Sequence, residues 1–257
     1  MPFNFITDPS IGGTCRLTLT EAIMVGLIPG TGSGVPVGYT ATSATGPTPI
    51  RATVYTAPGA AAQRSIKSAS ANDAAAGTGA QTVRITYYDA SMNGPFTEVV
   101  TLNGLTGVNT VGTNIANIER MDVVKVGSGG ANAGVISLMT QTGGNGTAIG
   151  SINTNDNRTF WAHHHVPPGF TTFITNITSS CSAGGAGAVT LNVLNPIDST
   201  VPSVIPTGIL RHGTTAAALT FSVPVGIPGP ALVFLIERPD SATAQTNFAS
   251  FGYIDLS

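Results

Sequence analysis

Residues 68–89, SASANDAAAGTGAQTVRITYYD, open the stretch that decides the fold, and EVVTLNGLTGV (98–108) and RMDVVKVGSGGANAGVISL (120–138) complete it. Three glycine-rich turns, AAAGTGA, LNGLTGV and GSGGANAG, separate runs of β-branched residues. Apolar and polar residues alternate from Thr82 to Tyr87, which is the period-two pattern of a half-buried strand. Such strands must stack to be stable, so the stretch predicts packed sheets and no catalytic site.

The same alternation and the turn residues around it predict further strands along the chain. The turn at 92–95 is too short for a parallel crossover, so the strands on either side of it are expected to be antiparallel. Residues 114–119 form either a short turn of helix or a bulge. About ten short strands with closely spaced turns predict an all-β, antiparallel sandwich that resembles a jelly roll. The further predicted strands are 96–103, 121–126, 135–139, 148–152, 170–179, 189–194, 219–223, 232–238 and 248–255.

Shifts in composition divide the chain into three parts. Residues 1–35 contain prolines and glycine pairs and are expected to form an extended N-terminal arm. The polar, glycine-rich run from Thr142 to Asn157 indicates a connection between two halves. We therefore expect a first β half over 36–145 and a second over 146–257, packed on the first or continuous with it.

The composition limits the classes of partner. Charged residues make up 9% of the 257 residues, hydrophobic residues 42%, and the formal net charge is −2. Nucleic-acid binding needs clustered lysine and arginine, and the ten basic residues here are scattered. So few charges are a poor basis for a freely soluble monomer. We infer that much of the neutral polar surface is buried against other copies or other proteins.

The two cysteines and the apolar segments predict neither a disulfide framework nor a membrane protein. Cys15 and Cys181 lie far apart in sequence; they either pair or, more simply, act as two small buried hydrophobes. The N-terminus has no basic region that leads into an apolar run, so no signal peptide is expected. The most apolar window, 216–236, contains three prolines, which argues against a transmembrane helix.

The run from His163 to His165 is the clearest candidate for metal chemistry. Neighbouring residues of a strand point to opposite faces, so His163 and His165 share a face and His164 does not. His212 would supply a third ligand. No carboxylate or cysteine stands beside the run at ligand spacing. The expectation is therefore no metal and no cofactor, with His163, His165 and His212 as the alternative ligand set and a strand edge or subunit contact beside Trp161 as the simpler role.

No other motif predicts catalysis. The glycine-rich segments 30–34 and 77–79 lack the strand-then-helix context of a phosphate loop. The oxygen-rich segment 153–157 lacks the distal glutamate of a calcium loop and is expected to be a solvated turn. Glu98 and Glu119 stand beside apolar strands; a glycosidase pair stays open because their separation in space is not visible in sequence. We assign no catalytic residue.

The opening stretch resembles a pattern of tailed-bacteriophage virion proteins, in which a Ser-x-Asn-Asp-x-x-x-Gly-Thr-Gly-Ala segment precedes a strand. A Glu-x-Val-x-Leu-Asn-Gly strand and turn follow, and then a Gly-Ser-Gly-Gly-x-Asn-x-Gly turn. The resemblance extends over about residues 65–255 and is strongest up to residue 140. The residues that form its turns are Asn72, Asp73, Gly77, Gly79, Asn103, Gly104, Gly127, Gly130, Asn132 and Gly134.

The resemblance implies a structural protein of the virion. The expected role is that of a capsid decoration or cement protein on the head surface, assembled in the cytoplasm of the bacterial host. Its partners would be the major capsid protein and copies of itself in a homotrimer, with no nucleic acid, membrane or small-molecule substrate. Two alternatives stay open: a tail, neck or fibre-base component, and a carbohydrate-binding β-sandwich for host attachment.

Overall fold

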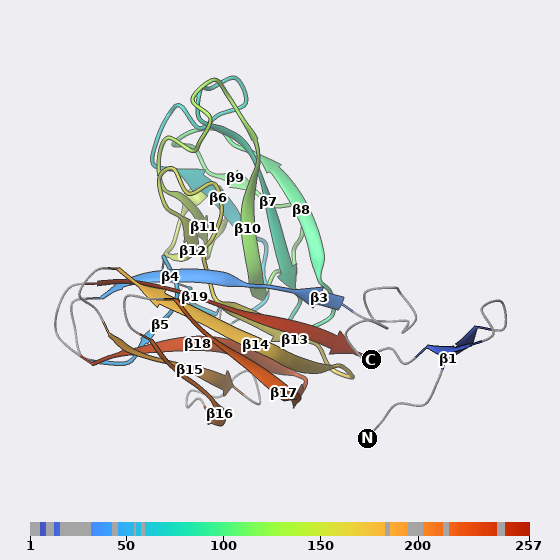
Figure 1. The fold of residues 1–257 in the computed structure, drawn as a ribbon. Helices are drawn as coiled ribbons and strands as arrows, with labels where there is room; N and C mark the ends of the chain where they lie inside the picture. The colour runs from blue at the N-terminus through green and yellow to red at the C-terminus, as the bar shows by residue number, and fades with distance from the viewer. Residues whose placement is uncertain are drawn as a thin grey trace.

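Two lobes of antiparallel strands make up the structure, a computed structural model (Figure 1). It describes residues 6–8, 13–15, 32–42, 46–53, 55–57, 60–182, 186–194, 203–212, 216–240 and 245–257. Residues 65–152 form most of the lobe at the top of Figure 1, which we call the upper lobe. The lobe below it, the sandwich lobe, contains strands from both sides of that segment.

The sandwich lobe consists of two antiparallel sheets. One has the order β13-β18-β15-β16, with β5 also paired to β18; the other has the order β17-β14-β19-β3, with β4 also paired to β19. Its strands are β3 (Gly32–Gly34), β4 (Val37–Thr42), β5 (Thr48–Pro49), β13 (His163–Val166), β14 (Thr171–Cys181), β15 (Gly187–Leu194), β16 (Ser203–His212), β17 (Ala217–Pro228), β18 (Ala231–Pro239) and β19 (Gln245–Leu256).

The upper lobe also consists of two antiparallel sheets, with the orders β10-β7-β8 and β12-β11-β6-β9. Alternate residues of each strand, such as Val83, Ile85 and Tyr87 of β7, are buried in the core between them. A single turn of 3-10 helix, Thr142–Gly144, follows β11. The strands are β6 (Ser65–Ser68), β7 (Ala80–Tyr88), β8 (Phe96–Thr101), β9 (Val108–Asn109), β10 (Asn117–Val126), β11 (Ile136–Met139) and β12 (Ala148–Ile152).

Strand β18 belongs to both hydrophobic cores. Val233 and Leu235 point into the core of the sandwich lobe, whereas Leu232, Phe234 and Ile236 pack in the core of the upper lobe. A strand that is buried on both faces needs a continuous apolar run, which explains ALVFLI at its start. The two lobes are therefore held together by apolar packing across one shared strand.

The upper lobe is an insertion between β5 and β13, and the chain enters and leaves it at one place. The N–H of Ala162 donates to the carbonyl of Ile50 (3.0 Å), and Arg51 forms an isolated bridge with Trp161. The expected division at residue 145 therefore differs from the observed lobes. Strands β3, β4 and β5 pair in the sandwich lobe, and β12 pairs with β11 in the upper lobe, because long-range pairing and not chain order decides the sheets.

The predicted all-β, antiparallel sandwich is confirmed, and the predicted strand 148–152 coincides with β12. The two strands around the turn at 92–95 are antiparallel, as expected. The alternative of a bulge at 114–119 is confirmed, because the register of β10 against β7 shifts between Ile118 and Arg120. The jelly-roll winding stays a prediction.

The expected arm, 1–35, contains a short antiparallel pair, β1 (Ile6–Asp8) with β2 (Gly13–Cys15), and most of it lies outside the described residues. Cys181 is buried at the end of β14, whereas the side chain of Cys15 is not among those described, so their pairing stays a prediction. Within the described ranges, no helix is long and apolar enough to span a bilayer.

Candidate functional site

Asp73 is the centre of a polar cluster that joins the three glycine-rich turns. Its side chain is 0% exposed and accepts hydrogen bonds from the backbone N–H groups of Ala80 (2.7 Å), Ala133 (2.8 Å) and Gly134 (2.9 Å). The hydroxyl of Ser68 donates a fourth bond (2.5 Å). A buried carboxylate is tolerated only when its oxygens are hydrogen-bonded in this way. We call Asp73 and the turns around it the Asp73 cluster.

Close backbone contacts explain the glycines of the Asp73 cluster. A Cβ on Gly79 would overlap the carboxylate of Asp73, and one on Gly77 would overlap the carbonyl of Asn72. A Cβ on Gly127 would overlap the carbonyl of Gly77, because the N–H of Gly127 donates to the neighbouring carbonyl of Gly79 (2.7 Å). Close packing of the turns therefore accounts for these glycines.

The other residues of the sequence pattern lie in the same turns. Asn103 and Gly104 form the second turn; Gly104 has φ +58° and donates its N–H to the carbonyl of Asp73 (2.8 Å). Gly130 has φ +74° in the third turn, a region that favours glycine. All three turns therefore depend on backbone geometry.

Asn132 connects the cluster to the segment 153–157. Its amide donates to the carbonyls of Gly134 (2.7 Å) and Asn153 (2.8 Å), and its carbonyl oxygen accepts from the N–H of Asn157 (3.0 Å). Asn157 returns the bond by accepting from the N–H of Asn132 (3.0 Å). The oxygen-rich segment thus holds the third turn in place instead of forming a solvated turn.

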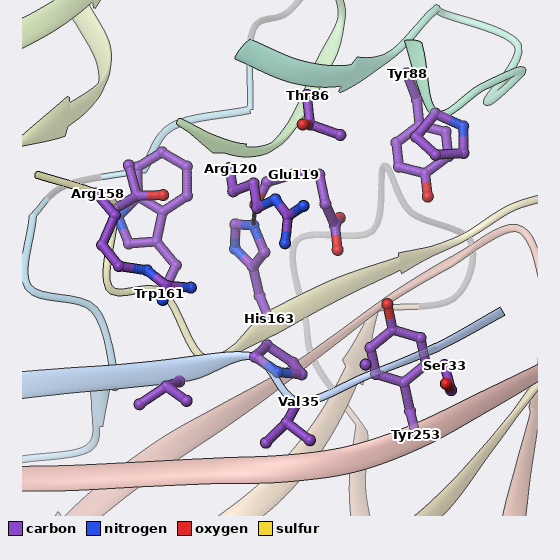
Figure 2. Close-up of a pocket in the computed structure, with 15 residues that line it drawn as sticks. Ser33, Val35, Thr86, Tyr88, Glu119, Arg120, Arg158, Trp161, His163 and Tyr253 are labelled. Carbon is purple, nitrogen blue, oxygen red and sulfur yellow. Dashed lines mark hydrogen bonds between the residues drawn. The ribbon is translucent and has the colours of Figure 1, made fainter. Parts of the chain in front are cut away.

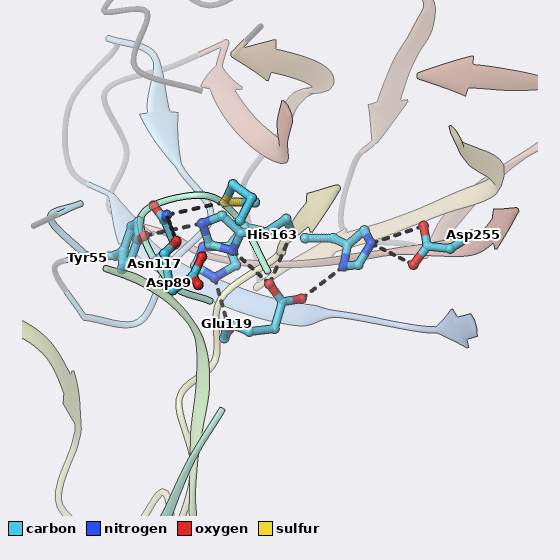
Figure 3. Close-up of polar contacts among 9 residues, drawn as sticks. Tyr55, Asp89, Asn117, Glu119, His163 and Asp255 are labelled. Carbon is cyan, nitrogen blue, oxygen red and sulfur yellow. Dashed lines mark hydrogen bonds and ion pairs between the residues drawn. The ribbon is translucent and has the colours of Figure 1, made fainter. Parts of the chain in front are cut away.

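A second polar cluster lies where the two lobes meet. Glu119 occupies the bulge of β10, and a bulge turns one side chain out of the regular alternation. Its carboxylate accepts hydrogen bonds from Nδ1 of His164 (2.9 Å), Nδ1 of His165 (2.7 Å) and the N–H of His165 (3.0 Å). Figure 3 shows the carboxylate of Glu119 directed at the histidine rings. Glu119 therefore connects the upper lobe to β13 of the sandwich lobe.

His164 is held between two carboxylates. Its Nδ1 bonds to Glu119 (2.9 Å), and its Nε2 lies 3.0 Å from Oδ2 of Asp255 on β19. The ring stacks on Tyr253, with 3.7 Å between ring centres, and Thr172 donates a hydrogen bond to Asp255. Burial lowers the pKa of His164, but the two carboxylates outweigh it and raise the pKa to about 9. His164 is therefore a buried imidazolium in a three-residue ion pair.

His163 and His165 lie on the opposite face of β13, as alternation predicts, with 5.1 Å between ring centres. His165 also contacts the hydroxyl of Tyr55 through Nε2 (3.3 Å). Nε2 of His163 lies 2.9 Å from the carbonyl of Glu119, whereas its Nδ1 is buried without a hydrogen-bond partner. Burial, with the charge of His165 and Arg51, holds the pKa of His163 well below its ordinary value.

The alternative ligand set, with His212 beside His163 and His165, does not form. His212 ends β16, which lies at the opposite edge of the sheet from β13, with β18 and β15 between them. Neighbouring strands are about 4.8 Å apart, so three steps exceed the reach of one metal ion. Glu119 is the acidic residue that lies close to both His163 and His165 instead. Glu119 lies 44 residues before His163 in the chain, which is too far for a recognisable metal-ligand motif. The only sequence signal at this position was the predicted bulge or helical turn at 114–119.

A small cavity of about 220 Å³ opens beside the histidines, and Figure 2 shows Glu119, His163, Tyr253 and Thr86 among the residues that line it. Val35, just after β3, also lines it. The hydroxyl of Thr86 is buried without a hydrogen-bond partner, like Nδ1 of His163. Two unsatisfied polar atoms therefore lie in residues that line one cavity, where water or an ion would satisfy them.

The two glutamates considered as a glycosidase pair have separate structural roles. Glu98, on β8, accepts hydrogen bonds from the N–H groups of Val111 (2.5 Å) and Gly112 (2.9 Å) and so caps a loop. Glu119 is engaged with the histidines on the far side of β7. The structure does not bring the two carboxylates onto a common partner.

No model of a known protein family matches the chain, and no curated protein matches its sequence. Among solved structures, that of infectious bursal disease virus, Gt strain, is similar to this chain at 8% sequence identity and a TM-score of 0.24. The alignment covers 88% of this chain and 70% of that one. A TM-score this low carries no argument about the fold or the function of this chain.

Proposed function

We propose that the protein is a structural component of a tailed-phage virion, a decoration or cement protein that bridges major capsid subunits on the head surface. The observation that carries the proposal is the Asp73 cluster. Residues of the sequence pattern that are up to about 60 positions apart converge on one buried carboxylate. The residues that carry the resemblance therefore form the packed turns of the upper lobe. Related structural proteins are expected to share such a packing arrangement.

The strand order of the sandwich lobe supports the proposal. In chain order, β4, β14, β17 and β19 belong to one sheet, and β13, β15, β16 and β18 belong to the other. Within the sheets the orders are β4-β19-β14-β17 and β13-β18-β15-β16, which are compatible with the predicted jelly roll of two Greek keys. Jelly rolls occur in viral capsid domains and in lectins, so the order agrees with a shell protein but does not by itself assign one.

The distribution of exposed apolar side chains agrees with a protein that binds copies of itself or shell subunits. Of the twelve large hydrophobic side chains exposed among the described residues, seven lie in the upper lobe and five in the sandwich lobe. Val99 on β8 and Val124 on β10 are on strands that flank β7, and Val111 is 85% exposed. The upper lobe carries more of these side chains, so we place the interface there.

The carbohydrate-binding alternative has less support. Sugar-binding sites commonly use exposed aromatic rings, and the chain has one tryptophan. Trp161 is 3% exposed and packs against Gly150, so its ring offers no platform to a sugar. A tail, neck or fibre-base position stays open, since it differs from the shell in symmetry and not in fold.

Copy number tests the proposal. We expect hundreds of copies per virion when the protein is quantified against the major capsid protein by mass spectrometry of purified particles. About a dozen copies per virion would indicate a neck or tail position instead of the shell. Absence of the protein from purified particles would reject a virion role. Deleting residues 2–14 tests the arm: we expect lower capsid occupancy, and unchanged occupancy would contradict an attachment role for the arm.

A further inference from the structure

We propose that Glu119, His163 and His165 form a binding site for one divalent transition-metal ion that joins the two lobes. One ligand atom from each residue lies within 4.8 Å of the other two. The set of two imidazoles and one carboxylate is typical of zinc and of other first-row transition metals. The carboxylate comes from β10 of the upper lobe and both imidazoles come from β13 of the sandwich lobe.

The hydrogen bonds of His163 leave a nitrogen ready for a metal. A carbonyl oxygen can only accept, so Nε2 of His163 carries the proton that it donates to the carbonyl of Glu119 (2.9 Å). In a neutral imidazole the other nitrogen, Nδ1, then carries a lone pair, and here it has no partner although the side chain is 1% exposed. A buried lone pair without a donor costs free energy that a metal ion would recover.

The distances need only a small adjustment. Ligands bound to zinc at about 2.0–2.2 Å in a tetrahedral site lie about 3.4 Å from one another. The ligand atoms lie within 4.8 Å of one another, so side-chain shifts of about 1 Å bring them to the distances that a metal needs. Nδ1 of His165 lies 2.7 Å from the carboxylate of Glu119 and is therefore the ligand atom on that side of the ring. Metal binding needs the tautomer in which the proton of His165 is on Nε2, which faces the hydroxyl of Tyr55 (3.3 Å).

The cavity supplies an entry path and space for a fourth ligand. Glu119 and His163 both line it, so an ion reaches the two residues from solvent without unfolding of either lobe. The unpartnered hydroxyl of Thr86 lines the same cavity and would hydrogen-bond a metal-bound water. Because its ligands come from both lobes, the ion would stabilise their contact.

The test uses the full chain, freed of metal by chelation and then titrated with Zn²⁺ in a calorimeter. We expect one Zn²⁺ per chain and a higher unfolding temperature with Zn²⁺ present. His163→Gln retains a donor near the carbonyl of Glu119 but loses Nδ1, and we expect its affinity to fall by more than about 10-fold. His212→Gln is the matched control, and we expect it to bind as the unsubstituted protein does.

Equal affinity of His163→Gln and the unsubstituted protein would overturn the proposal, as would an equal loss in His212→Gln. Absence of saturable binding by the unsubstituted protein would overturn it as well. X-ray absorption spectra of the Zn²⁺-loaded, unsubstituted protein need no variant and so do not depend on whether His163→Gln folds. We expect two imidazole ligands, and a spectrum with one or none would contradict the assignment.

Discussion

Asp73 is a buried carboxylate whose partners are mostly backbone N–H groups of turns that are distant in sequence. Its removal leaves three buried donors without acceptors, and each costs about 1–3 kcal/mol. We expect Asp73→Ala to lower the free energy of unfolding by about 3–5 kcal/mol, measured by urea denaturation.

The matched control for this substitution is Asp89→Ala. Asp89 also accepts backbone bonds, from Ser91 (2.8 Å) and Asn93 (2.9 Å), but these bonds are exposed to water. Water replaces an exposed acceptor, so we expect a small change in stability. Equal losses for the two substitutions would contradict the importance assigned to burial at Asp73.

Gly127 tests the packing of the turns. A Cβ at this position would overlap the carbonyl of Gly77 and the backbone of Thr78, so the two turns must separate in Gly127→Ala. Overpacking of this kind costs about 1–3 kcal/mol. Gly46→Ala is the control because its Cβ would meet open space. We expect thermal denaturation to show a lower midpoint for the first and an unchanged one for the second; equal midpoints would refute close packing of the turns.

At the scale of the elements, the ion pair of His164 with Glu119 and Asp255 connects β10, β13 and β19. Breaking a buried ion pair by removing one partner costs about 3–5 kcal/mol, because the other charge stays buried. We expect His164→Gln to destabilise the protein by this amount in urea denaturation. A double-substitution cycle with Asp255→Asn is expected to be non-additive.

Arg84→Gln is the control for the ion pair. It removes the part-buried pair of Arg84 with Asp122 (3.1 Å) at the protein surface, and surface pairs contribute about 1 kcal/mol or less. Additive effects of His164→Gln and Asp255→Asn, or a loss no greater than that of Arg84→Gln, would show that His164 does not connect the elements.

Strands with regular alternation could be predicted from sequence, and strands with broken patterns could not. β7 shows the alternation of a half-buried strand, and β12 is a short apolar run between turns, so both strands can be predicted from their own residues. β16 was not predicted because Pro206 and Gly208 interrupt SVIPTGILRH, yet β15 pairs with it along the sheet. Pairing with a neighbour overrides local propensity, and a single sequence does not contain that information.

The histidine cluster shows the same limit. Sequence alternation correctly predicts that His163 and His165 share a face. It does not reveal Glu119 beside them, because the contact is made by two strands of different lobes and depends on a one-residue bulge. The run of three histidines was a visible signal, but its acidic partner was visible only in three dimensions.

At the scale of the whole molecule, the proposed shell position predicts an effect of charge on the apolar side chains of the upper lobe. Aspartate at Val99 or Val124 places a charge in the proposed interface without disturbing a buried residue. A loss of 1.4 kcal/mol lowers affinity tenfold. We expect Val99→Asp and Val124→Asp to weaken rebinding to particles stripped of the protein by about tenfold or more.

Val204→Asp is the control for these substitutions, because Val204 is also exposed but lies on β16 of the sandwich lobe. We expect it to rebind normally. Normal rebinding of all three variants, each folded by circular dichroism, would place the interface outside the upper lobe.

A reconstruction of the virion by electron microscopy tests the central claim, a structural role on the phage head, most directly. The two lobes give the protein a distinctive outline, with the upper lobe inserted between β5 and β13 of the sandwich lobe. We predict density of this shape over the joints between major capsid subunits, repeated with the symmetry of the shell and arranged in trimers. Density of this shape confined to a ring at the neck or tail, or absent from the particle, would contradict the account.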